Sequence, residues 1–335
     1  MVESIFEKAN REIDLLSLAS RSVTLRKSGQ WYTGPCPFCG GRDRFNLKQA
    51  DKGWVWFCRK CGDGKYHSAV DFLLRSGGMR DVKEAVRPGR EPQAAKTGSG
   101  LIDAARWQAQ ANRFIDQCCY DLFLGDYQKP LQYLTLNRKL RREVLLGELV
   151  GYNRLERYEA GDQWGFEKQK RIWLPRGIVF PCLFSNLEVA SLKIRRPDHH
   201  PKYYKIPGSQ PGVFGYRNLR FTSLIAMTEG EIDCLTLEGE IGDLTGVCTL
   251  GSASDDLMNL DLVRWGFPFV AAKAICLFYD NDDSGRRGAQ RLGVIYKAIC
   301  EKLPDGFKDL NEMHCAGVDL PAWFCRLVEK HHLGC

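Results

Sequence analysis

Apolar positions in the first part of the chain predict helices on either side of a linker. Residues 4–20 place apolar side chains on one face of a short amphipathic helix, namely Ile5, Phe6, Ala9, Ile13, Leu16 and Leu18. Ser68 is the candidate N-cap of a second short helix. Residues 87–100, RPGREPQAAKTGSG, show no apolar period and predict a flexible linker. A long helical pattern then covers residues 101–124.

The second half of the chain changes to strand patterns. From residue 172 the apolar runs are short and β-rich: IWLP, GIVFPCLF and EVASLKI. From residue 224 short apolar runs alternate with helical patterns, in the order LIAMT, EIDCLTLEG, VCTLG, DDLMNLDLVRW, AICLFYD and GRRGAQRLGVIY. Such alternation predicts a parallel sheet covered by helices. We therefore expect a multi-domain α/β protein.

Composition and charge narrow the class of protein. The chain has 335 residues, enough for two or three domains, and its 44% hydrophobic and 27% charged content is typical of soluble globular proteins. No apolar run approaches the length of a membrane span, and the N-terminus, MVESIFEKANREIDLL, has no signal-peptide core. We expect a cytoplasmic protein without a membrane partner. The net charge of +7 is compatible with a polyanionic partner but does not identify one.

Four of the 14 cysteines form two C-x-x-C pairs, Cys36 with Cys39 and Cys58 with Cys61. Without a signal sequence, reduced thiols and a metal site are expected rather than a disulfide scaffold. Each pair can occupy two corners of a tetrahedron, so the spacing predicts a structural Zn²⁺ whose positions are all filled. Four buried free cysteines would not explain the paired spacing. His67 is a weaker candidate ligand.

Aromatic residues lie between the two cysteine pairs, in the run Gly53-Trp54-Val55-Trp56-Phe57. Such side chains can stack on unpaired bases, or they can form the small core of a zinc ribbon. Trp54, Trp56 and Arg59 are the candidate contacts to nucleic acid. The alternative is that about half of the aromatic residues form the core of the ribbon.

The stretch FYDNDDSG contains the densest group of acids. Asp280 and Asp282 are spaced as in the first half of an EF-hand loop, but loop position twelve is Arg291 instead of a glutamate. The preceding run, residues 274–279, predicts a buried strand and not a helix. The acids therefore lie at the C-terminal end of a strand, where open α/β sheets bind ligands.

Further acids follow other predicted strands and turns. Glu229 comes directly after LIAMT with Asp233 one helical turn later, and Asp309 lies in GFKDLNE. Because the C-terminal ends of parallel strands converge, these carboxylates are expected to cluster and to need a cation. Oxygen ligands alone favour Mg²⁺ or Mn²⁺, which can assist phosphoryl transfer. Any single acid can instead be a helix cap or a solvated loop residue, and Asp233 can simply support Glu229.

These motifs resemble a known family. E-G-x-x-D, D-x-D-x-x-G and K-D-x-[DN]-E, at residues 229–233, 280–285 and 308–312, resemble the Toprim domain of bacterial primases, topoisomerases, RecR-like proteins and some nucleases. The segment PLQYLTLNRKLRREVLLGELVGYN, the basic β-region SLKIRRPDHHPKYYKIPGSQPGVFG and the N-terminal cysteine-rich segment resemble DnaG-type primases of bacteria and phages. The resemblance covers residues 4–80 and 130–315 in family order.

The resemblance implies an organisation and a set of functional residues. The implied domains are a zinc-binding domain (1–86), a linker (87–100), a helical and basic β subdomain (101–221), a Toprim catalytic domain with a Rossmann-like sheet (222–318) and a C-terminal helix or tail (319–335). Glu229, Asp280 and Asp282 would hold catalytic Mg²⁺ or Mn²⁺, with Asp233 and Asp309 in support. Template phosphates or the triphosphate would meet a basic set: Lys193, Arg195, Arg196, Lys202, Tyr203 and Lys205. Interleaved cations and tyrosines suit a single strand, although a solvated strand face is the alternative.

The sequence differs from the family pattern in two features, the zinc ligands and residue 311. All four zinc ligands are cysteines, where cellular primases commonly include a histidine, and Asn311 stands where the family often has a second aspartate, which is expected to weaken one metal site. The short tail after Gly317 implies a minimal primase of a phage or mobile element, without a separate helicase-binding domain.

The function implied by the resemblance is that of a DNA primase. It would synthesise short RNA primers from NTPs on single-stranded DNA during replication, with a replicative helicase as partner. The alternatives are a Toprim nuclease or topoisomerase-like strand-breaking enzyme, and a non-catalytic DNA-binding accessory protein.

Overall fold

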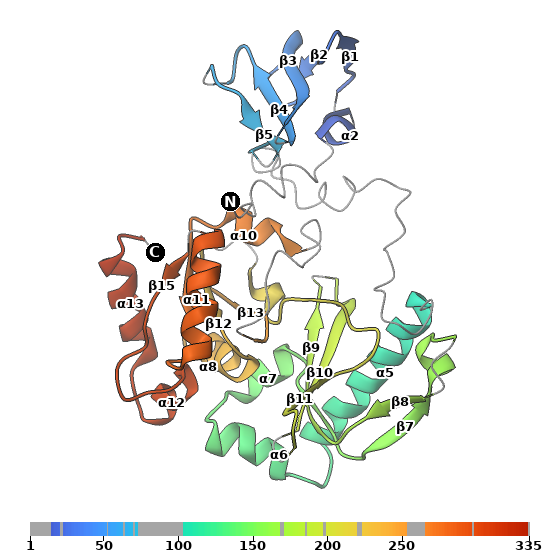
Figure 1. Ribbon diagram of the computed structural model, residues 1–335, viewed down its shortest axis with the longest axis vertical. Coiled ribbons are helices and arrows are strands. Elements are labelled where there is room, and N and C mark those ends of the chain that lie inside the picture. The colour runs from blue at the N-terminus through green and yellow to red at the C-terminus, as the bar shows by residue number, and fades with distance from the viewer. Residues whose placement is uncertain are drawn as a thin grey trace. The chain divides into compact units, whose positions relative to one another are not determined.

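The structure is a computed structural model that describes residues 15–20, 23–51, 53–62, 64–69, 71–72, 103–167, 171–184, 186–196, 199–219, 223–252, 265–296 and 298–333 (Figure 1). The chain forms two compact units, one of residues 1–91 and 260–271 and the other of residues 92–259 and 272–335. The predicted linker, the first part of the N-terminal helix and most of DDLMNLDLVRW lie outside the described residues.

The first unit contains a five-stranded antiparallel sheet in which each strand pairs with the next along the chain. Its strands are β1 (Arg26–Ser28), β2 (Trp31–Cys36), β3 (Gly40–Ala50), β4 (Gly53–Cys58) and β5 (His67–Ser68). Helix α2 (Leu15–Ser20) contributes to a small core with Phe45, Leu47 and Trp56 (Figure 1). The Ser68 hydroxyl accepts a hydrogen bond from the Asp71 N–H, as expected of a helix N-cap.

The second unit begins with a helical and β-rich part. Helix α5 (Ala104–Phe123) starts at Asp103, whose carboxylate caps it, and its buried face packs on an antiparallel sheet of order β11-β10-β9-β6. Those strands are β6 (Gly151–Asn153), β9 (Gly177–Leu183), β10 (Val189–Arg195) and β11 (Tyr203–Lys205). A separate hairpin pairs β7 (Arg157–Ala160) with β8 (Arg171–Leu174). The short helical segments are α6 (Lys129–Gln132), η1 (Tyr133–Asn137), α7 (Arg142–Gly147), η2 (Gly161–Trp164) and η3 (Tyr216–Leu219).

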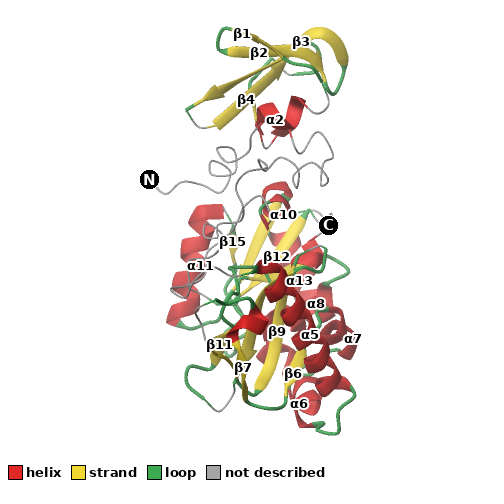
Figure 2. Cartoon of the chain, turned by 90° about the vertical axis from the view of Figure 1, so that its right-hand side faces the viewer, coloured by secondary structure: helices red, strands yellow, loops and turns green. Residues whose placement is uncertain are grey.

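The rest of this unit is built on a parallel sheet, as the βα alternation predicts. The strand order is β13-β12-β14-β15, with β12 (Leu224–Thr228), β13 (Gly246–Thr249), β14 (Ala274–Phe278) and β15 (Ile299–Cys300). The helices of this unit, in chain order, are α8 (Glu231–Ile241), α11 (Asp283–Tyr296), α12 (Leu310–Cys315) and α13 (Leu320–Lys330), whereas α10 (Phe267–Ala271) is grouped with the first unit. Helices α8 and α13 pack against one face of the sheet, and α11 lies on the other (Figure 2). The ribbon, the mixed part and the parallel sheet confirm the predicted fold class.

In the described part of the chain, none of the helices combines the length and the apolar composition that crossing a membrane requires.

Candidate active site and metal centre

The four predicted cysteines meet in the ribbon. The Sγ atoms of Cys36 and Cys61 are 3.6 Å apart, as are those of Cys39 and Cys58. All four lie within 4.8 Å of one another, and they are the only such group of three or more possible metal ligands among the described residues. Four sulfur atoms at about 2.3 Å from a tetrahedral Zn²⁺ would be separated by about 3.8 Å. The geometry therefore supports a closed zinc site.

Backbone amide groups donate hydrogen bonds to two of the four cysteine sulfur atoms. Amide groups of Phe38 and Lys60 point at the Sγ atoms of Cys36 and Cys58, both at 3.4 Å. Burial tends to raise the pKa of Cys58, but hydrogen bonds from the Cys61 and Lys60 amides, together with those of the Cys61 and Cys36 thiols, lower it to about 6. Burial raises the pKa of Cys36 and that of Cys61, so the four thiols differ in acidity and zinc would have to displace the remaining protons when it binds.

The three ribbon residues proposed to contact nucleic acid, Trp54, Trp56 and Arg59, differ in how far they are buried. Trp56 is 1% exposed, donates its indole N–H to the Ser68 carbonyl and stacks on His67, so the core alternative holds for Trp56. Trp54 is half-buried beside Tyr32. Arg59 is exposed, 4.0 Å from Asp43. Contacts of Trp54 and Arg59 with nucleic acid stay predictions.

The register of the parallel sheet brings the acids of two loops to one edge. Thr228 and Phe278 are partners in β12 and β14, so Glu229 and Asp280 leave the sheet side by side. Glu229 Oε2 accepts a hydrogen bond from the Asp280 N–H at 3.3 Å. Asp282 lies in the same loop, where its Oδ1 accepts from the N–H of Gly285 at 2.8 Å. We call Glu229, Asp280 and Asp282 the acidic edge.

Gly285 allows the first turn of α11 to approach this edge. A Cβ at this position would lie 2.2 Å from the carbonyl oxygen of Asp280 and 2.8 Å from Glu229 Oε2. Contacts that short are not tolerated, so only glycine fits. The glycine of the D-x-D-x-x-G motif therefore serves the packing of the helix against the acidic edge.

Burial and mutual repulsion raise the pKa values of Glu229 and Asp280. Burial, followed by the charges of Asp280 and Asp282, raises the pKa of Glu229 to about 7. Burial and then Asp309 raise the pKa of Asp280. Lys308 offsets part of this repulsion, since its Nζ lies 3.6 Å from Asp280 Oδ2. Uncompensated carboxylates of this kind are what a divalent cation would neutralise.

Asp233 and Asp309 lie behind the acidic edge and organise α12. Asp309 caps α12 by accepting from the Glu312 N–H. Asp233 Oδ1 accepts from the N–H of Asn311 at 2.9 Å. Asp233 is thus tied to the backbone at the start of α12, which fits the supporting position expected for it.

Asn311 is a buried structural residue, 1% exposed. Its side-chain N–H groups donate to the Arg138 carbonyl and the Thr236 hydroxyl, and its Oδ1 accepts from Arg138 at 3.1 Å. All of its polar capacity is therefore used inside the protein. Asn311 joins α12, α8 and the segment after η1, a role that its sequence position alone did not reveal.

Cations line the acidic edge, and two of them were not among the predicted site residues. Burial tends to lower the pKa of Arg138, but the hydrogen bond that it donates to Tyr133 and then the charges of Asp309 and Asp233 raise it. Lys308 adjoins Asp280. Burial and then the charges of Arg195, Arg138 and Lys308 lower the pKa of Lys202. We call Arg138, Arg195, Lys202 and Lys308 the cation cluster.

The predicted basic set divides between two sides of the β10–β11 pair. Lys193 Nζ contacts Glu231 at 2.8 Å and lies 4.3 Å from the centre of the Tyr203 ring, on the side of the cation cluster. Arg196 lies over the ring of Trp173, on the side of the β7–β8 hairpin. Lys205 is exposed. Roles of these residues in ligand binding stay predictions.

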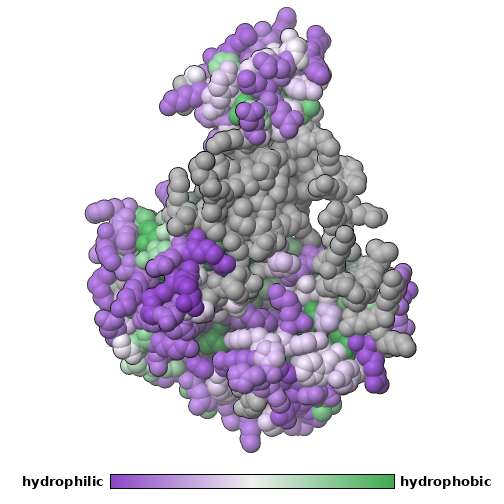
Figure 3. Space-filling model, viewed as in Figure 1, coloured by the Kyte–Doolittle hydropathy of each residue, from purple (hydrophilic) through white to green (hydrophobic). Residues whose placement is uncertain are grey.

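Helix α11 adds a further basic surface beside the acidic edge. Arg286, Arg287 and Arg291 are exposed on it, and Figure 3 shows a strongly hydrophilic patch over this helix.

Because of Asp233, we expect the free energy of unfolding to depend on pH. Burial, then Asp309, raises its pKa from 3.8 to about 8, so the folded state binds the proton more tightly than the unfolded state. The free energy of unfolding should therefore fall as pH rises towards 8. Asp233→Asn keeps an acceptor for Asn311 but cannot ionise. In metal-free buffer, we expect the wild-type protein to lose about 2 kcal/mol more than the variant between about pH 6 and pH 8, by urea unfolding. Parallel stability curves for the two proteins would contradict the raised pKa.

Comparisons with known proteins agree with this arrangement. The family described as the zinc-binding domain of primase-helicase matches residues 31–66. The DNA primase of Clostridium acetobutylicum is 25% identical over 352 residues, covering 93% of this chain and 56% of that protein. The chain thus spans little more than half the length of this curated relative.

Solved structures show the same fold. The Aquifex aeolicus primase, with its zinc-binding and RNA polymerase domains, superposes with a TM-score of 0.52 and 19% identity over 98% of this chain and 86% of that chain. A DnaG primase catalytic domain bound to ssDNA superposes with a TM-score of 0.51 and 15% identity over 67% of this chain and 81% of that chain. The zinc ribbon and the core with its Toprim-like sheet both have counterparts in bacterial DNA primases, and the chain is similar to DnaG-type DNA primases over most of its length.

Proposed function

We propose that the chain is a DNA primase, which synthesises short RNA primers on single-stranded DNA by metal-dependent nucleotidyl transfer. The observation that carries the proposal is the juxtaposition of the acidic edge with the cation cluster. Carboxylates suit divalent cations, and arginine and lysine suit phosphates. A site that holds both beside each other suits a nucleoside triphosphate with its metal.

The acidic edge fits Mg²⁺ or Mn²⁺ by the chemistry of its donors. The acidic edge offers only carboxylate oxygens, and the pKa of Glu229 is raised by burial and by the charges of Asp280 and Asp282. Glu229, Asp280 and Asp282 would hold the metal, with Asp233 and Asp309 supporting them from behind. A bound divalent cation would supply charge neutralisation at the phosphates.

The cation cluster has unused capacity for an anion. Arg195 is buried, and its Nε and Nη1 atoms have no hydrogen-bond partner among the described residues. Burial lowers the pKa of Lys202, and the positive charges of Arg195, Arg138 and Lys308 lower it further. The triphosphate of the incoming nucleotide would meet both needs, with Arg138 and Lys308 beside it.

The reaction would need no side-chain nucleophile. The 3′-hydroxyl of one nucleotide attacks the α-phosphate of the next, a P–O bond forms, the bond to the β-phosphate breaks and pyrophosphate leaves. This chain's residues would hold the triphosphate and align the two nucleotides, which is how positioning and electrostatics lower such barriers.

Partners are proposed on the same basis. The related catalytic domain bound to ssDNA supports a single-stranded DNA template here. The ribbon, through Trp54 and Arg59, would help to hold that template, and Lys193, Arg196, Tyr203 and Lys205 would add contacts around the core. The match to a zinc-binding domain of primase-helicase supports a replicative helicase as a partner.

The test is primer synthesis with purified protein, labelled NTPs, single-stranded DNA of mixed sequence and Mg²⁺. Template-dependent oligoribonucleotides are the expected product. Cleaved DNA without oligoribonucleotides would favour a strand-breaking enzyme. DNA binding with neither product, also in the presence of a helicase, would favour an accessory protein.

A further inference from the structure

Two arginines of the cation cluster share one aromatic ring. The Arg138 guanidinium lies 5.5 Å from the centre of the Tyr133 ring, and the Arg195 guanidinium lies 5.4 Å from the same centre. The Tyr133 hydroxyl also accepts a hydrogen bond from Arg138 Nε at 2.8 Å. Tyr133 is half-buried and was not among the predicted site residues. One tyrosine therefore contacts both of the arginines in the cluster.

A π-helical turn attaches Arg138 to Tyr133. Segment η1 begins at Tyr133, whose carbonyl oxygen accepts from the Arg138 N–H at 3.0 Å. In an α-helix that carbonyl would accept from the N–H of Asn137, so the wider turn is closed by Arg138 instead. The backbone and the side chain of Arg138 thus both bond to the same residue. Single π-helical turns occur frequently at functional sites.

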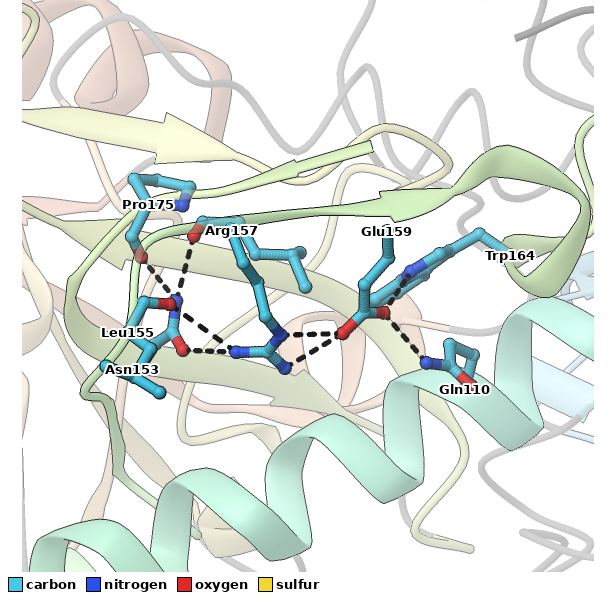
Figure 4. Close-up of polar contacts among 8 residues, drawn as sticks. Gln110, Asn153, Leu155, Arg157, Glu159, Trp164 and Pro175 are labelled. Atoms are coloured by element: carbon cyan, nitrogen blue, oxygen red, sulfur yellow. Dashed lines mark hydrogen bonds and ion pairs between the residues drawn. The ribbon is translucent and has the colours of Figure 1, made fainter. Parts of the chain in front are cut away.

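Arg157, elsewhere in the same unit, is held in a different way. Its guanidinium donates to Glu159 Oε1 and to Asn153 Oδ1, both at 2.9 Å (Figure 4). The Glu159 carboxylate compensates the positive charge of Arg157. An arginine held by an acid in this way has little charge left to attract a further anion.

The side chain of Arg138 is held by neutral groups. Besides the Tyr133 hydroxyl, it donates to Asn311 Oδ1 at 3.1 Å. The charges of Asp309 and Asp233 influence its pKa, but no ion pair joins either carboxylate to Arg138 in the described part of the chain. Its position is therefore fixed without a direct carboxylate partner.

Arg195 shows the same property more clearly. It is 4% exposed, and its Nε and Nη1 atoms have no hydrogen-bond partner among the described residues. A buried charge without a partner is unfavourable until an anion binds beside it. The Tyr133 ring attracts the guanidinium through its quadrupole and does not cancel the charge. Tyr133 therefore orients Arg195 while leaving it available to an anion.

We propose that Tyr133 is a positioning residue for the triphosphate of the incoming nucleotide. It would touch no substrate itself, and would hold Arg138 and Arg195 in the geometry in which both guanidinium groups meet the phosphates. The inference rests on the proposed function and adds a residue to its site. Two planar guanidinium groups at a fixed separation suit neighbouring phosphates. Arginines that are already oriented also lose less conformational freedom when the anion binds.

The first test measures the dissociation constant of ATP by displacement of fluorescent mant-ATP, with Mg²⁺ and without DNA, so that no primer can form. Tyr133→Leu is expected to weaken ATP binding about ten-fold, because both arginines lose their support. Tyr133→Phe keeps the ring and loses only the hydrogen bond to Arg138, so a loss of about three-fold is expected. AMP, which lacks the β- and γ-phosphates, should bind the wild-type protein and both variants within about two-fold.

Tyr127→Leu is the matched control. Tyr127 is 38% exposed, and its ring stacks on Tyr152 and on no arginine among the described residues. Its replacement should leave the dissociation constant of ATP unchanged. Equal ATP affinities of Tyr133→Leu and Tyr127→Leu would overturn the proposal. A parallel loss of AMP and ATP binding in Tyr133→Leu would also overturn it, because that result indicates a general disruption of the site.

A double-mutant cycle tests whether Tyr133 acts through Arg138. In a protein that already carries Arg138→Gln, Tyr133→Phe should change the dissociation constant of ATP by less than about 1.5-fold. Folding of each variant is checked by its urea unfolding midpoint. If Tyr133→Phe weakened ATP binding by the same factor with and without Arg138, the two residues would act independently and the positioning role would be wrong.

The outcome is distinguishable from that of the proposed function. Selective loss of ATP affinity in Tyr133→Leu would support the positioning role even if the wild-type protein made no primers. Primer synthesis by the wild-type protein, with unchanged ATP affinity in Tyr133→Leu, would retain the primase and reject the positioning role. A wild-type protein that neither bound ATP nor made primers would overturn both.

Discussion

Asp280→Asn is expected to reduce primer synthesis at least about a hundred-fold while the protein remains folded. Asp280 lies at the centre of the acidic edge, next to Glu229 and opposite Lys308. The asparagine has the same shape but lacks the charge that holds a divalent cation. Loss of metal-based charge stabilisation is worth several kcal/mol of the activation barrier. The measurement is the initial rate of oligoribonucleotide synthesis at saturating Mg²⁺.

The adjacent Asp283→Asn is the matched control. Asp283 is the first residue of α11, directly after the loop that carries Asp280; its side chain is 79% exposed and it pairs with Arg286 at the surface. Its replacement should leave the rate near that of the wild-type protein, because surface ion pairs contribute little. A similar loss in both variants would show that loop structure, and not Asp280, limits synthesis.

Thermal stability gives an independent readout of the same residue. Burial and Asp309 raise the pKa of Asp280, so its ionised form costs folding free energy when no metal is bound. Asp280→Asn should therefore match or exceed the wild-type melting temperature in EDTA. Added Mg²⁺ should stabilise only the wild-type protein. Stabilisation of both proteins by Mg²⁺ would mean that other carboxylates hold the metal.

The acidic edge could be predicted from sequence because its geometry depends on one general property of parallel sheets. Short apolar runs located β12 and β14, and the residues after parallel neighbours necessarily emerge at one edge. The cysteine pairs were equally predictable, since each pair meets within one turn. Both are local patterns joined by a single, well-defined type of pairing.

Residues contributed by distant segments could not be placed in this way. Arg138 reaches Asn311 across 173 positions, and no local pattern connects them. From the sequence, Asn311 was expected to weaken one metal site. In the structure its side-chain N–H groups instead donate hydrogen bonds to the Arg138 carbonyl and the Thr236 hydroxyl. The signal that could have drawn attention to Arg138 was its place within PLQYLTLNRKLRREVLLGELVGYN, the segment that resembles the primase core.

The sequence also did not show which face of a strand is covered, although side chains alternate between the two faces. The cations of residues 193–205 read as one basic stretch, but the β10–β11 register directs Arg196 and Tyr204 to one side and Lys193 and Tyr203 to the other. In the ribbon, β4 places Trp54 and Trp56 on the same side, and the packing of Phe38, Phe45 and Phe72 around Trp56 shows that this side faces the core. Faces of a sheet are thus assigned by what covers them, which composition does not state.

Removing zinc is expected to unfold the ribbon while the second unit stays folded. The ribbon has its own small core, and Cys36 and Cys58 are themselves part of it. Structural zinc contributes about 10 kcal/mol or more to such domains, far more than a core of this size can replace. Cys58→Ser should therefore lose the metal, expose the buried Trp56 and make the ribbon sensitive to protease.

The measurements are zinc content by native mass spectrometry and limited proteolysis of the whole chain. Cys300→Ser is the matched control, because Cys300 is exposed on β15 and lies outside the ribbon, so one zinc ion and full protease resistance should remain. Because the second unit has separate cores, its fragment should survive digestion of Cys58→Ser. Should Cys58→Ser instead retain one zinc ion and an intact ribbon, another group such as His67 would have to complete the site. The assignment of four cysteines as the zinc ligands would then be wrong. Removing one of four thiolate ligands from a tetrahedral site must weaken zinc binding.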